Sequence, residues 1–209
     1  MTKAPLRSAR NGSAEDAAPP RDEMIIRRAA RAFRERSYHG ASMQQIAAAA
    51  GVQKSTLYHH FASKDDILFR ILEEAVEILL RPLEEITARE IEPAEKLRLA
   101  VTNHVRALCE HVDLLAVLLF ETRTFSRKIE RQIKPQRDQY NALLLTIIRD
   151  GISQGQFRTV DPRIALYGIF GMCNWVCQWY RPKGPISPAE LAREYADLAL
   201  TALRPDGKK

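Results

Sequence analysis

The sequence predicts an all-α protein of about nine helices, in which a small N-terminal head is joined to a larger helical body. Apolar residues recur at helical spacing along most of the 209 residues. Residues that cap helices precede several of these runs, as at Ser63, Asp161 and Ser187. No segment shows the alternation that is typical of a half-buried strand. We therefore expect a disordered arm over residues 1–21, a head over 22–66 and a body over 67–209.

The head is predicted to begin with a helix over about 22–36, followed by two short helices. Ser42 is a suitable N-cap for the first short helix, whose inward-facing residues include Ile46 and Ala50. Gly51 supplies the left-handed residue that a tight turn between helices requires. The two short helices are therefore expected to pack closely against each other.

The second short helix carries a polar face. Leu57 and Phe61 lie one turn apart and point inward, so the intervening and preceding residues face outward. These outward residues are Lys54, Ser55, Thr56, Tyr58 and His59. A tight turn followed by a helix with a hydrogen-bonding face that fits a major groove indicates a helix-turn-helix motif. We therefore expect the head to bind DNA, and the candidates to reach base edges are Lys54, Ser55, Thr56 and His59.

The body is predicted to contain six further helices. A long helix begins after Ser63 and continues toward Ile91, so it joins the head to the body. Later helices begin with prolines or capping residues. They are expected over about 93–108, 113–122, 126–154, 161–180 and 187–203.

The spacing of residues from the Ser42 cap onward follows a known pattern. The matching segments are Ile46-Ala47, Ala50-Gly51-Val52, Thr56-Leu57-Tyr58, His60-Phe61 and Ser63-Lys64, preceded by a first helix around Arg27 to Phe33. In these segments the chain resembles the TetR family of bacterial transcriptional regulators, over about residues 22–70. Gln53 departs from the family, which usually has Ser or Thr at the start of the recognition helix.

The resemblance implies further DNA contacts in the head. Tyr58 and Lys64 match family positions that contact the DNA backbone, and Ser42 matches one whose helix start meets a phosphate. Gln53, at the start of the recognition helix, completes the expected set. An ordinary surface role is the alternative for Tyr58, and packing between the head helices is the alternative for His60.

Positive charge is concentrated near the N-terminus. Residues 1–65 hold eleven Lys or Arg against six Asp or Glu, whereas the rest of the chain holds twenty-one against twenty. This distribution agrees with phosphate binding by the head. Arg7, Arg10 and Arg21 are candidates for additional phosphate contacts, and a solvated tail without a specific role is the alternative.

Several protein classes lack support in the sequence. No signal peptide or membrane-spanning run is visible, so we expect a cytoplasmic protein without membrane contact. No hydrolase, phosphate-loop or dinucleotide motif occurs, so we expect no enzyme activity and no cofactor.

The three cysteines define the main alternative function, a helical metal- or thiol-based sensor or enzyme. Cys173 and Cys177 lie one helical turn apart, which places two thiolates on one helix face, and Cys109 is the third. Burial in an apolar helix is the other explanation, because free cysteine behaves as a small hydrophobe. His104 and His111 stand seven residues apart, too far to chelate one ion from adjacent turns.

The body is expected to hold a small hydrophobic ligand. Aromatic and aliphatic residues of the middle helices are the candidate lining, and a few polar residues would orient the ligand. The candidates are Leu79, Phe120, Leu144, Phe170 and Trp175, with Arg123, Asn174 and Gln178 as the polar groups. Packing in the core is the alternative for each of them.

A second resemblance concerns the C-terminal part of the chain. Its residues are Asn174-Trp175, Trp179-Tyr180-Arg181-Pro182, Gly184 and Ile186-Ser187-Pro188. This stretch is similar to a TetR subgroup that controls fatty-acid or sterol-ring degradation and responds to acyl-CoA thioesters. The resemblance implies an acyl-CoA effector whose phosphates meet basic residues such as Arg123, Arg127, Arg163 or Arg181. A surface role is the alternative for each of these arginines.

Gly168 and Gly171 lie three residues apart inside a predicted helix, which favours close approach of another helix. The family resemblance implies a homodimer through the last two helices, about 161–180 and 187–203. Two heads one turn of DNA apart, ~34–36 Å, read a palindromic operator. The sequence thus predicts a homodimeric repressor that leaves its operator when the effector enters the body. Activation in place of repression is the alternative.

Overall fold

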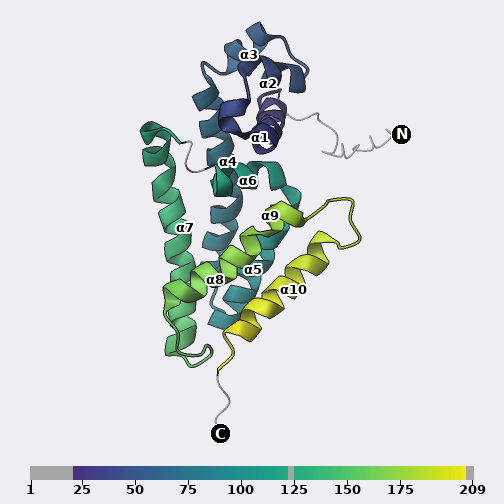
Figure 1. Cartoon of the computed structure of the whole chain (residues 1–209). Coiled ribbons are helices and arrows are strands. Elements are labelled where there is room, and N and C mark those ends of the chain that lie inside the picture. The colour runs from purple at the N-terminus through teal and green to yellow at the C-terminus, as the bar shows by residue number, and fades with distance from the viewer. Residues whose placement is uncertain (1–20, 122–124, 206–209) are drawn as a thin grey trace, which may run out of the picture.

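The computed structural model describes residues 21–121 and 125–205. Within these ranges the chain forms helices and no strand, which confirms the predicted all-α class. Figure 1 shows a small head at one end, a larger helical body, and the long helix α4 passing from one to the other. The helices are α1 (Arg21–Gly40), α2 (Met43–Ala49), α3 (Lys54–His60), α4 (Lys64–Thr87), α5 (Pro93–Glu110), α6 (Val112–Phe120), α7 (Arg127–Ser153), α8 (Pro162–Asn174), α9 (Val176–Trp179) and α10 (Pro188–Ala202).

The head packs α1, α2 and α3 around a small apolar core. A capping box begins α2: Gln45 N donates to the Ser42 hydroxyl, and Ser42 N donates to Oε1 of Gln45. Gly51 has a φ of 66°, which confirms the left-handed residue predicted in the turn before α3. Leu57 is fully buried and Phe61 is 6% exposed. The predicted helix-turn-helix arrangement is therefore present.

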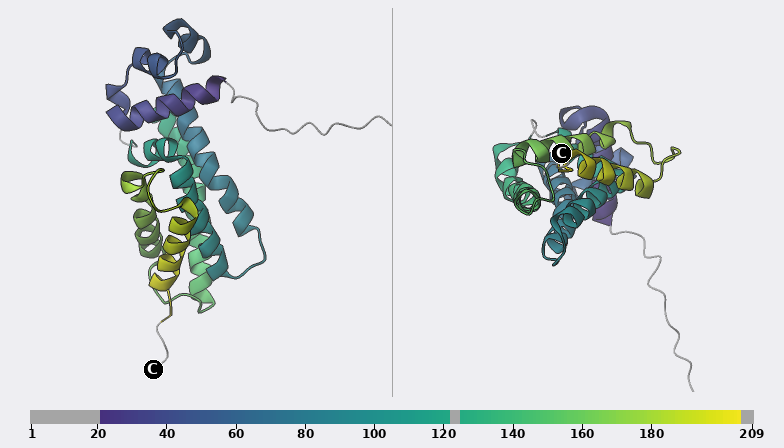
Figure 2. Two further views of the ribbon diagram at one scale, coloured as in Figure 1. Left: turned by 90° about the vertical axis from the view of Figure 1, so that its right-hand side faces the viewer. Right: turned by 90° about the horizontal axis from the view of Figure 1, so that it is seen from below.

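Helix α5 occupies the centre of the body. It contacts α4, α7, α8 and α10, and the contact with α10 is the most extensive between any two described helices. Both views in Figure 2 show α10 lying along α5, and α7 packs against α4. Leu97 and Leu108 of α5 are fully buried, and burial of a leucine side chain stabilises the fold by roughly 1.5–3 kcal/mol.

Three helix boundaries differ from the prediction. α1 continues to Gly40, but Ser37 has a φ of 60° and interrupts it just after the predicted end. α4 ends at Thr87 and does not reach Ile91, because a short connection precedes Pro93 at the start of α5. The helix predicted over 161–180 breaks at Trp175 into α8 and the single turn α9, which packs against α5 and α6. Counted as one interrupted helix, α8 and α9 bring the described helices to the nine predicted.

None of the described helices is both long and apolar enough to cross a bilayer.

Candidate DNA-binding and effector sites

The polar face of α3 is turned toward solvent. Lys54, Ser55, Tyr58 and His59 are exposed, and Tyr58 retains 47% of its accessible area. Lys54 Nζ lies 5.8 Å from the centroid of the Tyr58 ring. This face therefore combines a cation, hydroxyl groups and an imidazole, which are the groups that bind phosphates and base edges.

Three other predicted DNA contacts lie in α3 or just before α2 and α3. Thr56 is half-buried within α3, and Ser42 is exposed at the start of α2. The side chain of Gln53 precedes α3 and makes no capping hydrogen bond. The first N–H groups of α3 therefore lack a side-chain acceptor from their N-cap residue. Contact of these residues with DNA stays a prediction.

Lys64 has a structural role that sequence reasoning missed. Its Nζ donates to the carbonyl oxygens of Tyr38 at 2.9 Å and Ala41 at 3.0 Å, and lies 4.4 Å from the Tyr38 ring centroid. The Tyr38 hydroxyl donates to Asp65, and burial together with this carboxylate raises the pKa of Tyr38. Lys64 thus fastens the end of α1 to the start of α4. An ammonium has three hydrogens, so one remains for the predicted phosphate contact.

Ionic and polar contacts connect α1 with α3 in the head and with α6 in the body. His60 Nδ1 lies 2.5 Å from Asp22 Oδ1, which joins α3 to α1. Arg34 Nη1 lies 2.6 Å from Oδ1 of Asp113, at the start of α6. Tyr38 N donates to Oε2 of Glu121, just after α6, at 3.4 Å. Helix α6 therefore touches the head at both of its ends.

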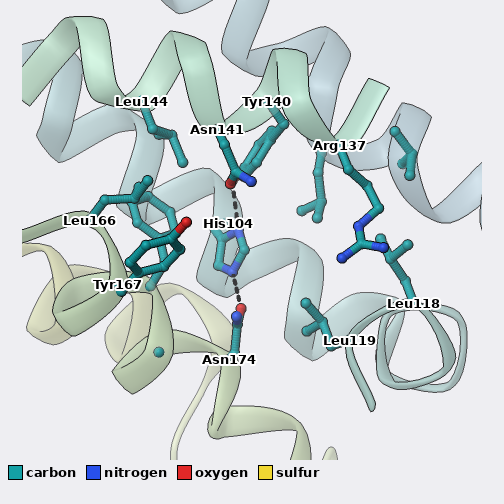
Figure 3. Close-up of a pocket in the computed structure, with 14 residues that line it drawn as sticks. His104, Leu118, Leu119, Arg137, Tyr140, Asn141, Leu144, Leu166, Tyr167 and Asn174 are labelled. Atoms are coloured by element: carbon teal, nitrogen blue, oxygen red, sulfur yellow. Dashed lines mark hydrogen bonds between the residues drawn. The ribbon is translucent and has the colours of Figure 1, made fainter. Parts of the chain in front are cut away.

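A cavity of about 280 Å³ lies among α4, α5, α6, α7 and α8. Figure 3 shows side chains of α7 facing those of α6 and α8 across it. The lining is mainly aliphatic and aromatic, with a few amide, hydroxyl, imidazole and guanidinium groups, and the described part of the chain contributes no carboxylate to it. The lining residues are Val76, Leu79, His104, Leu118, Leu119, Arg137, Tyr140, Asn141, Leu144, Leu166, Tyr167, Phe170, Gly171 and Asn174. This combination is typical of small-molecule sites, and the volume is just below their usual range of roughly 300–1,000 Å³.

His104 is the polar centre of the cavity wall and is only 3% exposed. Its Nδ1 lies 2.7 Å from the Tyr140 hydroxyl oxygen, and its Nε2 lies 2.8 Å from Oδ1 of Asn174 (Figure 3). Burial lowers the pKa of His104 to about 4, so the ring is neutral at neutral pH and carries one N–H. Because Oδ1 of Asn174 only accepts, this hydrogen is assigned to Nε2, and the Tyr140 hydroxyl donates to Nδ1.

Four of the predicted ligand residues line this cavity, namely Leu79, Leu144, Phe170 and Asn174. Three others do not. Phe120 is 43% exposed at the end of α6, Trp175 is 61% exposed, and Gln178 of α9 is exposed as well. The break at Trp175 explains why Trp175 and Gln178 lie outside the cavity, because the cavity-facing side of α8 does not continue into α9.

The arginines predicted to meet phosphates are also placed by the structure, with one exception. Arg127, Arg163 and Arg181 are exposed and lie outside the cavity lining, and Arg123 lies outside the described residues. Among the described residues that line the cavity, the arginine is instead Arg137, which sequence reasoning missed. Tyr140 and His104 were missed as cavity residues too. The available signal for His104 was its position one turn from Ala100 and Leu108 on the buried face of α5.

The cysteine cluster has the features of a packed core. Cys109, Cys173 and Cys177 are all buried. Burial raises the pKa of Cys109 to about 11 and those of Cys173 and Cys177 to about 12. Such thiols carry little thiolate at neutral pH, and the thiolate is the form that binds metals and attacks electrophiles. The described part of the chain also contains no group of three His, Cys, Asp or Glu residues placed to hold a metal ion.

Exposed apolar side chains gather on α8 and α10. Ile164, Tyr167 and Trp175 are each more than 60% exposed, and Leu198 of α10 is 53% exposed. A Cβ added to Gly168 or Gly171 would meet no atom within 4 Å, so contacts within this chain do not require either glycine. Large exposed apolar patches are typical of interaction surfaces, so these side chains are candidates for one.

Comparisons with known proteins agree with these features. A family model described as bacterial regulatory proteins, tetR family, matches residues 25–71. A second model, Tetracyclin repressor-like, C-terminal domain, matches residues 90–203.

Individual relatives match most of the chain. The HTH-type transcriptional repressor KstR2 of Mycobacterium tuberculosis is 25% identical over 185 residues, which cover 88% of this chain and 92% of the relative. The fatty acid metabolism regulator protein of Bacillus subtilis is 29% identical over 153 residues, 73% of this chain and 79% of the relative. The crystal structure of AibR in complex with isovaleryl coenzyme A and operator DNA has a TM-score of 0.77 at 26% identity, covering 90% of this chain and 100% of that one.

Proposed function

Since the chain belongs to the tetR family of bacterial regulatory proteins, we propose that it represses transcription from a palindromic operator until a small hydrophobic effector enters the body. The observation that carries this proposal is the position of α6. Leu118 and Leu119 of this helix line the cavity, and residues at its two ends contact α1 of the head. An occupant that moves α6 therefore acts on the head directly.

The exposed face of α3 supports the DNA half of the proposal. Lys54, Ser55, Thr56 and His59 are assigned to base edges, and Ser42, Gln53, Tyr58 and Lys64 to the backbone and the helix starts. The head spans few base pairs, so specific binding needs two heads one turn of DNA apart. The bare N-terminus of α3 adds partial positive charge facing the phosphates.

The exposed apolar face of α8 and α10 supports a homodimer. Covering Ile164, Tyr167, Trp175 and Leu198 against a second copy removes apolar area from water at roughly 25 cal/mol per Å². Helices α8 and α10 of the two copies would then form a four-helix interface. Gly168 and Gly171 on the same helix permit close approach of the partner backbone.

The cavity and the relatives support an acyl-CoA thioester as the effector. The cavity lining is mainly apolar, and AibR is a relative that was crystallised with isovaleryl coenzyme A and operator DNA. An effector that binds the released conformation better shifts the population toward it. A typical coupling of ~1–3 kcal/mol weakens operator binding roughly 5- to 150-fold.

The test is fluorescence-anisotropy binding to the DNA upstream of this protein's own gene, first with a salt titration and then with added acyl-CoA thioesters. We expect tight, salt-dependent binding that a thioester reverses. Binding that thioesters leave unchanged would retain the regulator and remove the effector class. Equal binding to upstream and random DNA would contradict the operator assignment.

A further inference from the structure

The hydrogen bonds of His104 leave defined donors unused on the cavity wall. The carbonyl oxygen of Asn174 accepts the hydrogen bond from His104 Nε2. The side-chain NH2 group of Asn174 therefore retains two N–H donors. No described residue provides an acceptor for them. Asn174 itself lines the cavity, and Figure 3 shows it at the end of the hydrogen-bonded chain that starts at Tyr140. The wall therefore presents a fixed amide donor to any occupant.

A cation faces the same cavity, and no described residue is its anionic partner. Arg137 of α7 is half-buried and forms no ion pair with any residue in the described ranges. Figure 3 shows its guanidinium group extending toward Leu118 and Leu119 of α6. None of the lining residues in the described ranges is acidic, so these residues offer the Arg137 guanidinium no counter-charge. A partly buried charge is stabilised strongly by an opposite charge that arrives with a ligand.

We propose that Arg137 and Asn174 together recognise an anionic acyl compound, with Asn174 donating to its carbonyl oxygen and Arg137 pairing with its anionic group. The apolar chain then lies against Leu79, Leu144 and Phe170. His104 is a positioning residue, because its hydrogen bond to Oδ1 turns the N–H donors of Asn174 toward the ligand. This inference rests on the proposed effector function and adds the groups that read the ligand.

The size of the cavity limits the occupant. A volume of about 280 Å³ accommodates an acyl chain of short or medium length, and the nucleotide part of coenzyme A has to remain outside. Arg137 therefore meets either the carboxylate of a free acid within the cavity or a phosphate of a thioester at the cavity opening. Both sources share the pairing of a planar guanidinium with an oxyanion.

The experiment measures ligand binding by calorimetry on the purified full chain without DNA. The probes are octanoyl-CoA, its thioether analogue octyl-CoA, octanoate, neutral octanol and coenzyme A alone. We expect wild-type protein to prefer octanoyl-CoA or octanoate over octanol, and octanoyl-CoA over the thioether that lacks the carbonyl oxygen. The preferred probe identifies the source of the anion.

Variants assign each role. Arg137→Gln should weaken the preferred anionic probe about 10-fold or more and leave octanol unchanged, whereas Arg131→Gln, on the exposed face of the same helix, should change neither. Asn174→Leu should remove most of the preference for octanoyl-CoA over octyl-CoA. His104→Phe should remove the same preference and retain octanol binding, and a merely structural role would instead weaken all probes equally.

Operator binding by the same preparations separates failure of this inference from failure of the proposed function. Variants that bind operator like wild type but show unchanged ligand preferences would overturn this inference and leave the regulator intact. Failure of every probe to bind the wild type would overturn it as well. Failure of the wild-type protein to bind the operator would contradict the proposed function itself.

Discussion

The face of α3 and the cavity of the body are built from helices in different ways. The polar face lies within residues 54–59, and its direction is determined by Leu57 within this stretch and Phe61 two residues after it. The polar centre of the cavity instead joins His104 to partners 36 and 70 residues away in the sequence. A surface of the first kind depends on one helix being docked correctly. A site of the second kind depends on the packing of several helices at once.

The largest expected effect separates the two sides of α3. Leu57→Ala removes a fully buried side chain and should lower the free energy of unfolding by about 2–5 kcal/mol. Tyr58→Ala, next to it on the exposed side, should change stability by less than about 0.5 kcal/mol and weaken DNA binding. Urea unfolding and anisotropy binding measure the two properties. Equal losses of stability in the two variants would show that Tyr58 contributes to the packing of the head as much as Leu57 does.

The next effect tests the cavity through pH. The pKa of His104 is about 4 in the folded protein and about 6.5 in the unfolded chain. Between these values the unfolded chain binds the proton and the folded protein does not. The free energy of unfolding therefore falls as the pH drops through this window, by a total of about 3 kcal/mol.

Urea unfolding at pH 7.5 and pH 4.5 measures this dependence. The decrease should be smaller in His104→Gln, which keeps a polar side chain but does not titrate. Identical decreases in the free energy of unfolding of the two proteins would mean that folding does not lower the pKa of His104.

A third effect concerns close packing in the body. A Cβ at Gly151 of α7 would lie 2.1 Å from Cδ2 of Phe157, so Gly151→Ala should cost about 1–3 kcal/mol of stability. Adding Phe157→Leu removes the clashing ring atoms and should recover part of the loss. Thermal unfolding of the single and double variants measures this. A double variant that is less stable than the sum of its single changes would contradict the steric explanation.

The smallest effect divides the roles of two lysines in the head. Lys64→Ala should weaken binding to all DNA sequences and lower the salt slope by about one, whereas Lys54→Ala should relax preference at one operator position. Because Lys64 also binds the carbonyls of Tyr38 and Ala41, its loss should cost about 1–2 kcal/mol of stability. Equal losses on specific and random DNA for both variants would refute this division.

The head was predictable because its signals are local. Caps, a left-handed glycine and two inward residues lie within about 20 positions, and each has its own physical reason. The two hydrogen bonds that Lys64 donates within the head were not predictable. Their acceptors are backbone carbonyls 23 and 26 residues earlier in the chain.

The cavity was predictable only in part. Leu79, Leu144, Phe170 and Asn174 line the cavity because each lies on the side of its helix that faces the neighbouring helices of the body. Trp175 lies outside it, at the break that ends α8, and the pattern gives no sign of this break. Arg137 was missed because a charged residue on α7 resembles any solvent-exposed arginine until the opposing helices are in place.

The length of α4 has a mechanical consequence. Its 24 residues form a rod of about 36 Å, and Val76, which lines the cavity, lies about 18 Å from the end that Lys64 anchors to the head. A tilt of roughly 10° about Val76 would displace that end by ~3 Å. Such a displacement exceeds the tolerance of a hydrogen bond to DNA. A small tilt of α4 would therefore be amplified at its head end. A conformational change too small to alter the fold would then misalign the head with the major groove of DNA.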